Sequence, residues 1–160
     1  MDVRPLTARV GLGFDVHPFA DDGRPLVLAG VALDGPGLSG HSDADVVAHA
    51  VADALLGAAG LGDLGTHFPD TDPEFAGIDS LQLLGSVVGK VREGYEIGNV
   101  DATVILEVPR LAPHREAMEE RLREVVGAPV SIKAKRAEAL GALGRREGIA
   151  CLAVAIVSPR

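Results

Sequence analysis

Large aromatic side chains are scarce in this chain of 160 residues, which has four Phe, one Tyr and no Trp, or 3% aromatics. Apolar residues nevertheless make up 47% of the sequence, so a core has to be built from Val, Leu, Ala and Ile. A chain of this length is expected to form one domain that is large enough to bury such a core. Because large rings are so few, we expect contacts between subunits to contribute to stability.

Cysteine, basic charge and long apolar runs are scarce as well, and each limits the possible functions. Cys151 is the only cysteine and lies in an apolar segment, which predicts a buried, inert thiol. The net charge of −8 argues against nucleic acid or an anionic membrane as a partner. The most apolar run, residues 46–61, contains His49 and Asp53 and does not resemble a membrane span. With no signal peptide before the first predicted strand, these features favour a cytoplasmic protein.

An Asp-x-His pair, Asp15 and His17, occurs in a segment whose alternating apolar residues predict a strand over residues 9–19. The side chains of a strand alternate between its faces, so these two project from the same face. The other face is expected to pack on the core. That other face carries Val10, Leu12, Phe14 and Val16.

His49, in a predicted helix, could supply a third ligand beside this pair. Two His and one carboxylate form the ligand set of a catalytic zinc site, which keeps its fourth tetrahedral position open. An Asp-x-His pair alone is more often an accident of the surface. The metal hypothesis therefore depends on the rest of the chain.

The predicted helix begins with Ser42 as its N-cap and Asp45 in the capping-box position. Asp45, His49 and Asp53 recur every four residues and form one polar stripe. One of these carboxylates could accept the second ring N–H of His49 and fix its tautomer. Equally, both carboxylates could simply be exposed to solvent. His41 and Ser42 lie at the helix entrance, where free N–H groups favour an anion such as phosphate.

Periodicity and the positions of Gly and Pro predict the other elements. Residues 62–73 contain two Pro, two Gly and three Asp, which predicts an irregular loop of the kind that often carries function. Residues 1–8 are expected to be a flexible leader and residues 9–160 a single α+β domain, in which helices pack on one face of a mixed β-sheet. Further strands are expected at residues 25–33, 95–108, 130–135 and 149–157, and further helices at 78–93 and 113–126.

Five of the fifteen basic residues lie within fourteen positions near the end of the chain. One basic segment in an acidic chain favours an anionic small-molecule substrate. The alternative is a salt-bridged surface loop that uses Glu138 and Glu147. The five basic residues are Lys133, Lys135, Arg136, Arg145 and Arg146.

Eight groups of residues, spread from Arg9 to the last predicted strand, also match a known family in order and spacing. They are residues 11–17 (GLGFDVH), 41–45 (HSDAD), 53–58 (DALLGA), 62–65 (GDLG), 68–73 (FPDTDP), 98–101 (GNVD), 109–110 with 113–114 (PR, PH), and 144–145 with 147–150 (GR, EGIA). On these residues the chain resembles the 2-C-methyl-D-erythritol 2,4-cyclodiphosphate synthase family over nearly its whole length.

The resemblance implies a homotrimer with active sites between adjacent subunits. It implies one Zn²⁺ per subunit, held by Asp15, His17 and His49, and a second ion, Mg²⁺ or Mn²⁺, held by Glu138 on the substrate diphosphate. His41 and Arg136 are assigned catalytic roles. The implied substrate-binding positions are Asp15, Val16, His17, His41, Ser42, Asp63, Leu64, Gly65, Phe68, Pro69, Asp70, Thr71, Asp72, Leu106, Glu107, Val108, Pro109, Arg110, Leu111, Ala112, Lys135, Arg136, Ala137, Glu138, Ala142 and Arg145.

The family reaction belongs to the non-mevalonate pathway of isoprenoid biosynthesis. It converts 4-diphosphocytidyl-2-C-methyl-D-erythritol 2-phosphate to the cyclic diphosphate and CMP. Because the attacking phosphate is already anionic near neutral pH, no general base is needed, and catalysis consists of positioning and charge screening. Two alternatives stay open: a zinc-dependent phosphoesterase, and a catalytically inactive metal-binding trimer.

The chain departs from the family pattern at two places. Lys135, Arg136 and Ala137 precede Glu138, where a Thr-rich run is common, and Ala142 stands where Phe is usual. Since a guanidinium can bind phosphate through two parallel hydrogen bonds, we expect altered phosphate binding with activity retained. The alanine puts in doubt the binding of isoprenoid diphosphate in the central cavity of the trimer. Arg145 matches an arginine of that cavity and is present.

Overall fold

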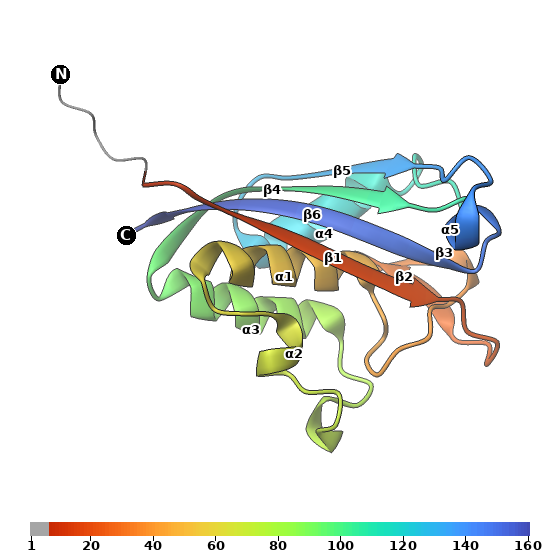
Figure 1. Ribbon diagram of the computed structural model, residues 1–160, viewed down its shortest axis with the longest axis horizontal. Helices are drawn as coiled ribbons and strands as arrows, with labels where there is room; N and C mark the ends of the chain where they lie inside the picture. The colour runs from red at the N-terminus through yellow and green to blue at the C-terminus, as the bar shows by residue number, and fades with distance from the viewer. Residues whose placement is uncertain (1–6) are drawn as a thin grey trace.

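A four-stranded mixed sheet forms one layer of the molecule, and helices cover one of its faces (Figure 1). The computed structural model describes residues 7–160. The strand order is β1-β6-β4-β5, in which β6 is antiparallel to both neighbours and β4 and β5 are parallel. The predicted α+β class is therefore confirmed. The four strands are β1 (Arg9–Pro18), β4 (Tyr95–Ile105), β5 (Val130–Lys135) and β6 (Gly148–Pro159).

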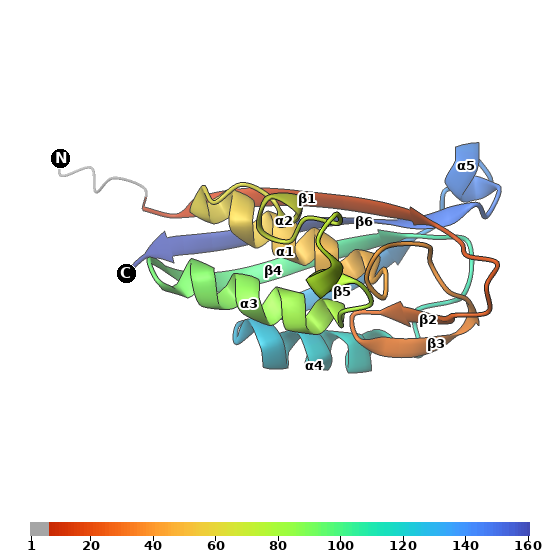
Figure 2. The ribbon, with the colours of Figure 1, turned by 90° about the horizontal axis from the view of Figure 1, so that it is seen from below.

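The helices α1 (Val46–Ala59), α3 (Ser80–Arg92) and α4 (Arg115–Val126) lie side by side against the sheet (Figure 2). Nearly all of α1 is buried, because it packs on the sheet with one side and on α3 with another. Of these three helices α4 is the most exposed, and it buries only its apolar stripe of Met118, Leu122 and Val126. Within residues 7–160, no helix is both long and apolar enough to cross a membrane.

Shorter elements form where the sequence predicted other structure. The expected strand over residues 25–33 is a hairpin of β2 (Pro25–Leu28) and β3 (Val31–Pro36). Ala29 and Gly30 turn the chain between them with positive φ values of 51° and 71°, as a tight two-residue hairpin requires. The expected irregular loop contains two single turns, and another turn precedes β6. These turns are α2 (Leu64–His67), the 3₁₀ turn η1 (Pro73–Phe75) and α5 (Gly141–Gly144).

The first helix begins three residues later than predicted. Asp45, not Ser42, is its N-cap, with an extended backbone conformation and a side chain that accepts hydrogen bonds from the N–H groups of Val47 and Ala48. The capping-box prediction was therefore wrong. Of the predicted leader, residues 1–6 lie outside the described residues, so its flexibility stays a prediction.

The predicted faces of β1 are reversed in the structure, and this reversal positions the candidate site. A Cβ on Gly13 would lie 1.8 Å from the carbonyl oxygen of Ala50, and one on Gly11 would lie 1.9 Å from that of Ala54. Only glycine lets the backbone of α1 approach the strand so closely. The glycine face is therefore the buried one, and Asp15 and His17 on the same face point toward α1. The apolar side chains face away from the helices, with exposed fractions of 66% for Val10, 65% for Leu12, 54% for Phe14 and 48% for Val16.

Candidate metal centre and substrate pocket

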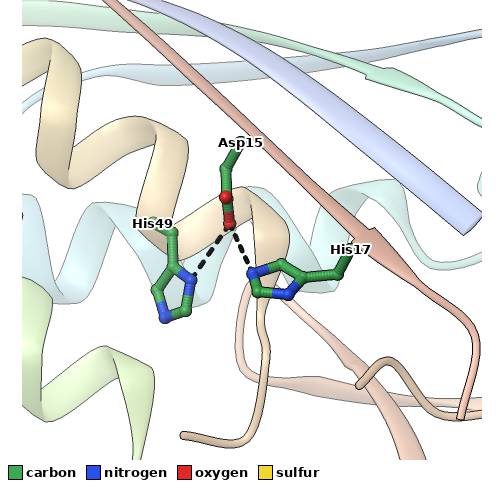
Figure 3. Close-up of side chains that lie close together, drawn as sticks. All are labelled: Asp15, His17 and His49. Atoms are coloured by element: carbon green, nitrogen blue, oxygen red, sulfur yellow. Dashed lines mark hydrogen bonds and ion pairs between the residues drawn. The ribbon is translucent and has the colours of Figure 1, made fainter. Parts of the chain in front are cut away.

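Asp15, His17 and His49 meet where the end of β1 passes the first turns of α1 (Figure 3). One carboxylate oxygen of Asp15, Oδ2, lies 2.8 Å from His17 Nε2 and 3.0 Å from His49 Nδ1. The side chains are 24%, 19% and 13% exposed, in the same order. The predicted ligand triad is therefore assembled within one subunit and remains partly open to solvent.

The hydrogen bonding of His17 shows why the neutral side chains of this cluster suit a cation. His17 Nδ1 lies 2.8 Å from the carbonyl oxygen of Ser39, which can only accept, so Nδ1 carries the ring proton. In the neutral ring Nε2 then holds a lone pair 2.8 Å from Asp15 Oδ2, and none of the described residues donates a hydrogen bond to it. An imidazole lone pair directed at a carboxylate needs a proton or a metal ion between them. Two imidazoles and one carboxylate fit Zn²⁺ or another divalent ion.

The two neighbouring histidines favour the ionised form of Asp15, which is the form that binds a metal ion. Burial by itself raises the pKa of Asp15, but hydrogen bonds and charges from His17 and His49 outweigh it and lower the pKa to about 2. The hydrogen bond to Asp15 raises the pKa of His17, although burial opposes the shift. In the metal-free protein, a proton shared between His17 and Asp15 would supply the positive charge that this pair needs. A metal ion has to displace that proton, so its affinity should rise with pH.

The two carboxylates of the predicted polar stripe, Asp45 and Asp53, bind backbone N–H groups. They neither contact His49 Nε2 nor simply face solvent, which were the two alternatives that the sequence left open. Asp45 is fully buried, caps α1 and accepts hydrogen bonds from the N–H groups of Ala29 at 2.9 Å and Gly30 at 2.7 Å. Burial raises the pKa of Asp45, and the backbone hydrogen bonds oppose that shift. Asp53 accepts a hydrogen bond from the N–H of Leu64 at 2.7 Å. The two residues therefore hold the β2–β3 hairpin and the α2 turn against α1, and neither is the partner of the second nitrogen of His49.

A pocket of about 530 Å³ opens beside the triad. It gathers ten of the residues expected to bind metal or substrate, together with four that were not expected to bind either. Phe68 and Phe75, one from each set, pack edge to face with their ring centroids 5.2 Å apart. Phe75 could have been proposed from the sequence, because it is an apolar ring within a polar loop. The expected residues are Asp15, His17, His41, Ser42, His49, Leu64, Gly65, Phe68, Pro69 and Asp70; the others are Gly40, Asp53, Phe75 and Leu83.

A second hollow, of about 190 Å³, lies beside the ends of β4 and β5. Inside it Arg136 donates from Nη2 and Nε to one oxygen of Glu107, at 2.8 and 3.1 Å. The Glu107 side chain is only 3% exposed, whereas that of Arg136 is 65% exposed. This pairing was not foreseen. The hollow is lined by Leu106, Glu107, Pro109, Arg110, Leu111, Ala112, Ala134, Lys135 and Arg136.

Several predicted substrate-binding residues line neither hollow within the single subunit. Asp63 and Asp72 accept hydrogen bonds at the starts of α2 and η1, and Val16 lies on the outer face of β1. Glu138 has a positive φ of 53° in the loop after β5. The remaining residues of this group are Thr71, Val108, Ala137, Ala142 and Arg145.

Fold and site together define an α+β protein with a two-His, one-carboxylate centre that opens into a substrate-sized pocket. The sequence model described as the YgbB family matches residues 8–158. The chain belongs to this family, as its sequence motifs predicted.

Curated relatives are about half identical to the chain. The 2-C-methyl-D-erythritol 2,4-cyclodiphosphate synthase of Cupriavidus metallidurans is 53% identical over 163 residues, which cover 99% of this chain and 96% of the relative. The synthase of the same name from Laribacter hongkongensis is 54% identical over 160 residues, covering 97% of this chain and 98% of the relative.

Solved structures of related enzymes share the fold. The bifunctional IspDF of Campylobacter jejuni superimposes with a TM-score of 0.91 at 41% identity, over 96% of this chain and 42% of that one. IspF of Plasmodium falciparum, solved as a CDP complex, superimposes with a TM-score of 0.83 at 31% identity, over 96% of this chain and 97% of that one.

Proposed function

We propose that this chain converts 4-diphosphocytidyl-2-C-methyl-D-erythritol 2-phosphate to 2-C-methyl-D-erythritol 2,4-cyclodiphosphate and CMP. The observation that carries the proposal is the assembly of Asp15, His17 and His49 at a pocket, in a chain half identical to relatives named for this reaction. Those names also support the predicted class, a lyase of isoprenoid biosynthesis. The metal identities, the residue roles and the assembly are further parts of the proposal.

The residues at the pocket suit a reaction between two phosphate groups. The 2-phosphate oxygen forms a bond to the β-phosphorus, and the bond from that phosphorus to the oxygen of CMP breaks, so CMP leaves with the electron pair. A divalent cation, proposed to be Zn²⁺, would supply the positive charge that screens these anions. His41 and Ser42 line the same pocket and would orient the methylerythritol phosphate. No residue has to remove a proton from the nucleophile.

The second hollow is proposed to hold the cytidine nucleotide. Lys135, Arg136 and Arg110 give it positive charge, and Leu106 and Leu111 supply apolar walls. The description of the P. falciparum relative as a CDP complex supports a nucleotide of this kind. Glu138, in the adjoining loop, is proposed to hold Mg²⁺ or Mn²⁺ on the diphosphate. We place the enzyme in the cytoplasm on its composition alone.

Product analysis tests the function. Purified enzyme with Zn²⁺ and Mg²⁺ should convert the substrate to the cyclic diphosphate and equimolar CMP, followed by ³¹P NMR and chromatography. A chelator should stop both products together, because the screening charge is lost. A hydrolysed linear product would establish the phosphoesterase alternative. A protein that binds metal without turnover would establish the inactive alternative.

The outer face of the sheet supports the homotrimer. Leu12 lies opposite Val154 and Phe14 opposite Leu152 in the β1–β6 pairing, and all four side chains are at least 36% exposed in the single chain. A contiguous apolar strip of this kind is typical of a surface that is covered in an assembly. With two separate hollows in each subunit, assembly could bring the nucleotide hollow of one subunit to the metal centre of the next.

A charge on this strip should prevent assembly. Leu12→Lys would bury an unpaired ammonium in the interface, so we expect sedimentation velocity to show monomers and product formation to fall sharply. Leu61→Lys places the same charge on an exposed leucine outside the sheet and should leave the trimer intact. An active monomer at micromolar concentration, in the variant or the parent chain, would contradict the proposed assembly.

A further inference from the structure

The second ring nitrogen of His49 has a partner that no local sequence pattern suggested. His49 Nε2 lies 2.9 Å from the hydroxyl oxygen of Ser80, the first residue of α3. Ser80 is only 1% exposed, and its hydroxyl also contacts Oδ1 of Asp43. The N–H of Ser80 donates to the other oxygen of Asp43 at 3.2 Å. A series of polar contacts therefore runs from Asp43 through the buried Ser80 to His49.

The donors and acceptors of Asp43, Ser80 and His49 permit one arrangement of protons when Asp43 is ionised. A carboxylate can only accept, so the single hydroxyl proton of Ser80 is donated to Asp43. The Ser80 oxygen then has only lone pairs left for His49, and Nε2 must carry the ring proton. In a neutral imidazole, Nδ1 is consequently a lone pair directed at Asp15, 3.0 Å away.

We infer that Ser80 and Asp43 are positioning residues that hold His49 in the tautomer whose Nδ1 binds the catalytic metal ion. This inference rests on the proposed function, because it assigns the cation to the triad. Outer hydrogen bonds of this kind orient a ligating imidazole and raise its affinity for metal. Ser42 is the competing partner, since its hydroxyl oxygen lies 3.1 Å from the same nitrogen. However, Ser42 Oγ already accepts the N–H of Ala44 and has no contact to a carboxylate among those described.

Zinc affinity tests the inference without any turnover measurement. Metal-free protein is titrated with Zn²⁺ against a chromophoric chelator, and the parent chain is compared with Ser80→Ala and Ser86→Ala. We expect Ser80→Ala to weaken zinc binding by about 10- to 100-fold. Ser86→Ala should have no effect, because this exposed serine of the same helix donates only to the Gln82 carbonyl. If Ser42→Ala weakens binding more than Ser80→Ala does, the assignment to Ser80 is wrong.

Nitrogen NMR of the zinc-bound protein adds a signature that a purely structural role would not change. The parent chain should show a slowly exchanging Nε2–H proton of His49, and Ser80→Ala should lose it. Should Ser80→Ala fail to fold, Asp43→Asn answers the same question. The amide of the new asparagine can donate to the Ser80 oxygen, which frees the Ser80 hydroxyl to donate to His49 Nε2. The zinc affinity should therefore fall again, and the slowly exchanging Nε2–H proton should again be lost. Unchanged affinity with a protected proton in the folded variant would overturn the inference. Absence of cyclic product from the parent chain would instead overturn the proposed function alone.

Discussion

Replacing His49 with alanine is expected to abolish binding of the proposed cation and nearly all turnover, while the proposed trimer survives. The side chain supplies one of three ligands, and the two that remain, Asp15 and His17, come from a single strand. Two ligands hold a divalent ion far more weakly than three, so the charge that screens the phosphates is lost. Alanine has the highest helix propensity and suits α1, so the fold should persist.

Three measurements check this expectation. They are the metal content after chelation and dialysis, the sedimentation of the protein, and product analysis. His114→Ala is the matched control, because this histidine precedes α4 and its side chain makes no capping hydrogen bond. The control should keep stoichiometric zinc. An His49→Ala protein that still carried stoichiometric zinc after the same treatment would remove His49 from the metal site.

The ligand pair on β1 could be predicted because it depends only on local geometry. Alternation along a strand places Asp15 and His17 on one face whatever the rest of the molecule does. Which face is buried depends on tertiary packing, and here hydrophobicity was misleading. The glycines allow α1 to lie on the strand at backbone contact, whereas the apolar residues between them are left for another surface. An exposed apolar face is what a subunit that is stable only in an assembly would present.

Partners far apart in the sequence could not be predicted. Spacing made Asp45 and Asp53, each one turn from His49, candidate partners of its second nitrogen, but the structure places Ser80 there, 31 residues away. Asp45 is buried instead because two N–H groups of the β2–β3 turn need an acceptor. Such contacts form only when separate segments of the chain meet, so the periodicity of the sequence does not predict them.

The pairing of Arg136 with Glu107 is a second contact of this type and refines the expected role of the arginine. The family resemblance implied that both residues bind substrate, without pairing them. The structure joins them across 29 positions, and Arg136 in turn lowers the pKa of Glu107 through the hydrogen bond and its charge. Glu107 uses Nε and Nη2 of the guanidinium and leaves Nη1 available. We therefore expect the carboxylate to fix the guanidinium in place, with one side still able to meet the diphosphate.

Arg136→Ala is expected to lower turnover by roughly 10²-fold or more, the scale of a lost electrostatic donor. The effect should fall on turnover more than on substrate affinity, because negative charge redistributes as CMP departs. Arg136→Thr should recover only part of the rate. Lys135→Ala should chiefly weaken substrate binding, with an effect that shrinks as salt rises.

Loss of the arginine also leaves the covered Glu107 carboxylate without its partner, so a folding defect has to be separated from a catalytic one. The double variant Glu107→Gln/Arg136→Ala removes the stranded charge. Its melting temperature should return toward that of the parent chain, while its turnover should stay as low as that of Arg136→Ala. If the double variant regained activity along with stability, Arg136 would act only by supporting the wall of the hollow. Unchanged steady-state kinetics in Arg136→Ala at low salt would exclude the guanidinium from the reaction altogether, and the backbone of residues 133–138 would then have to bind the diphosphate.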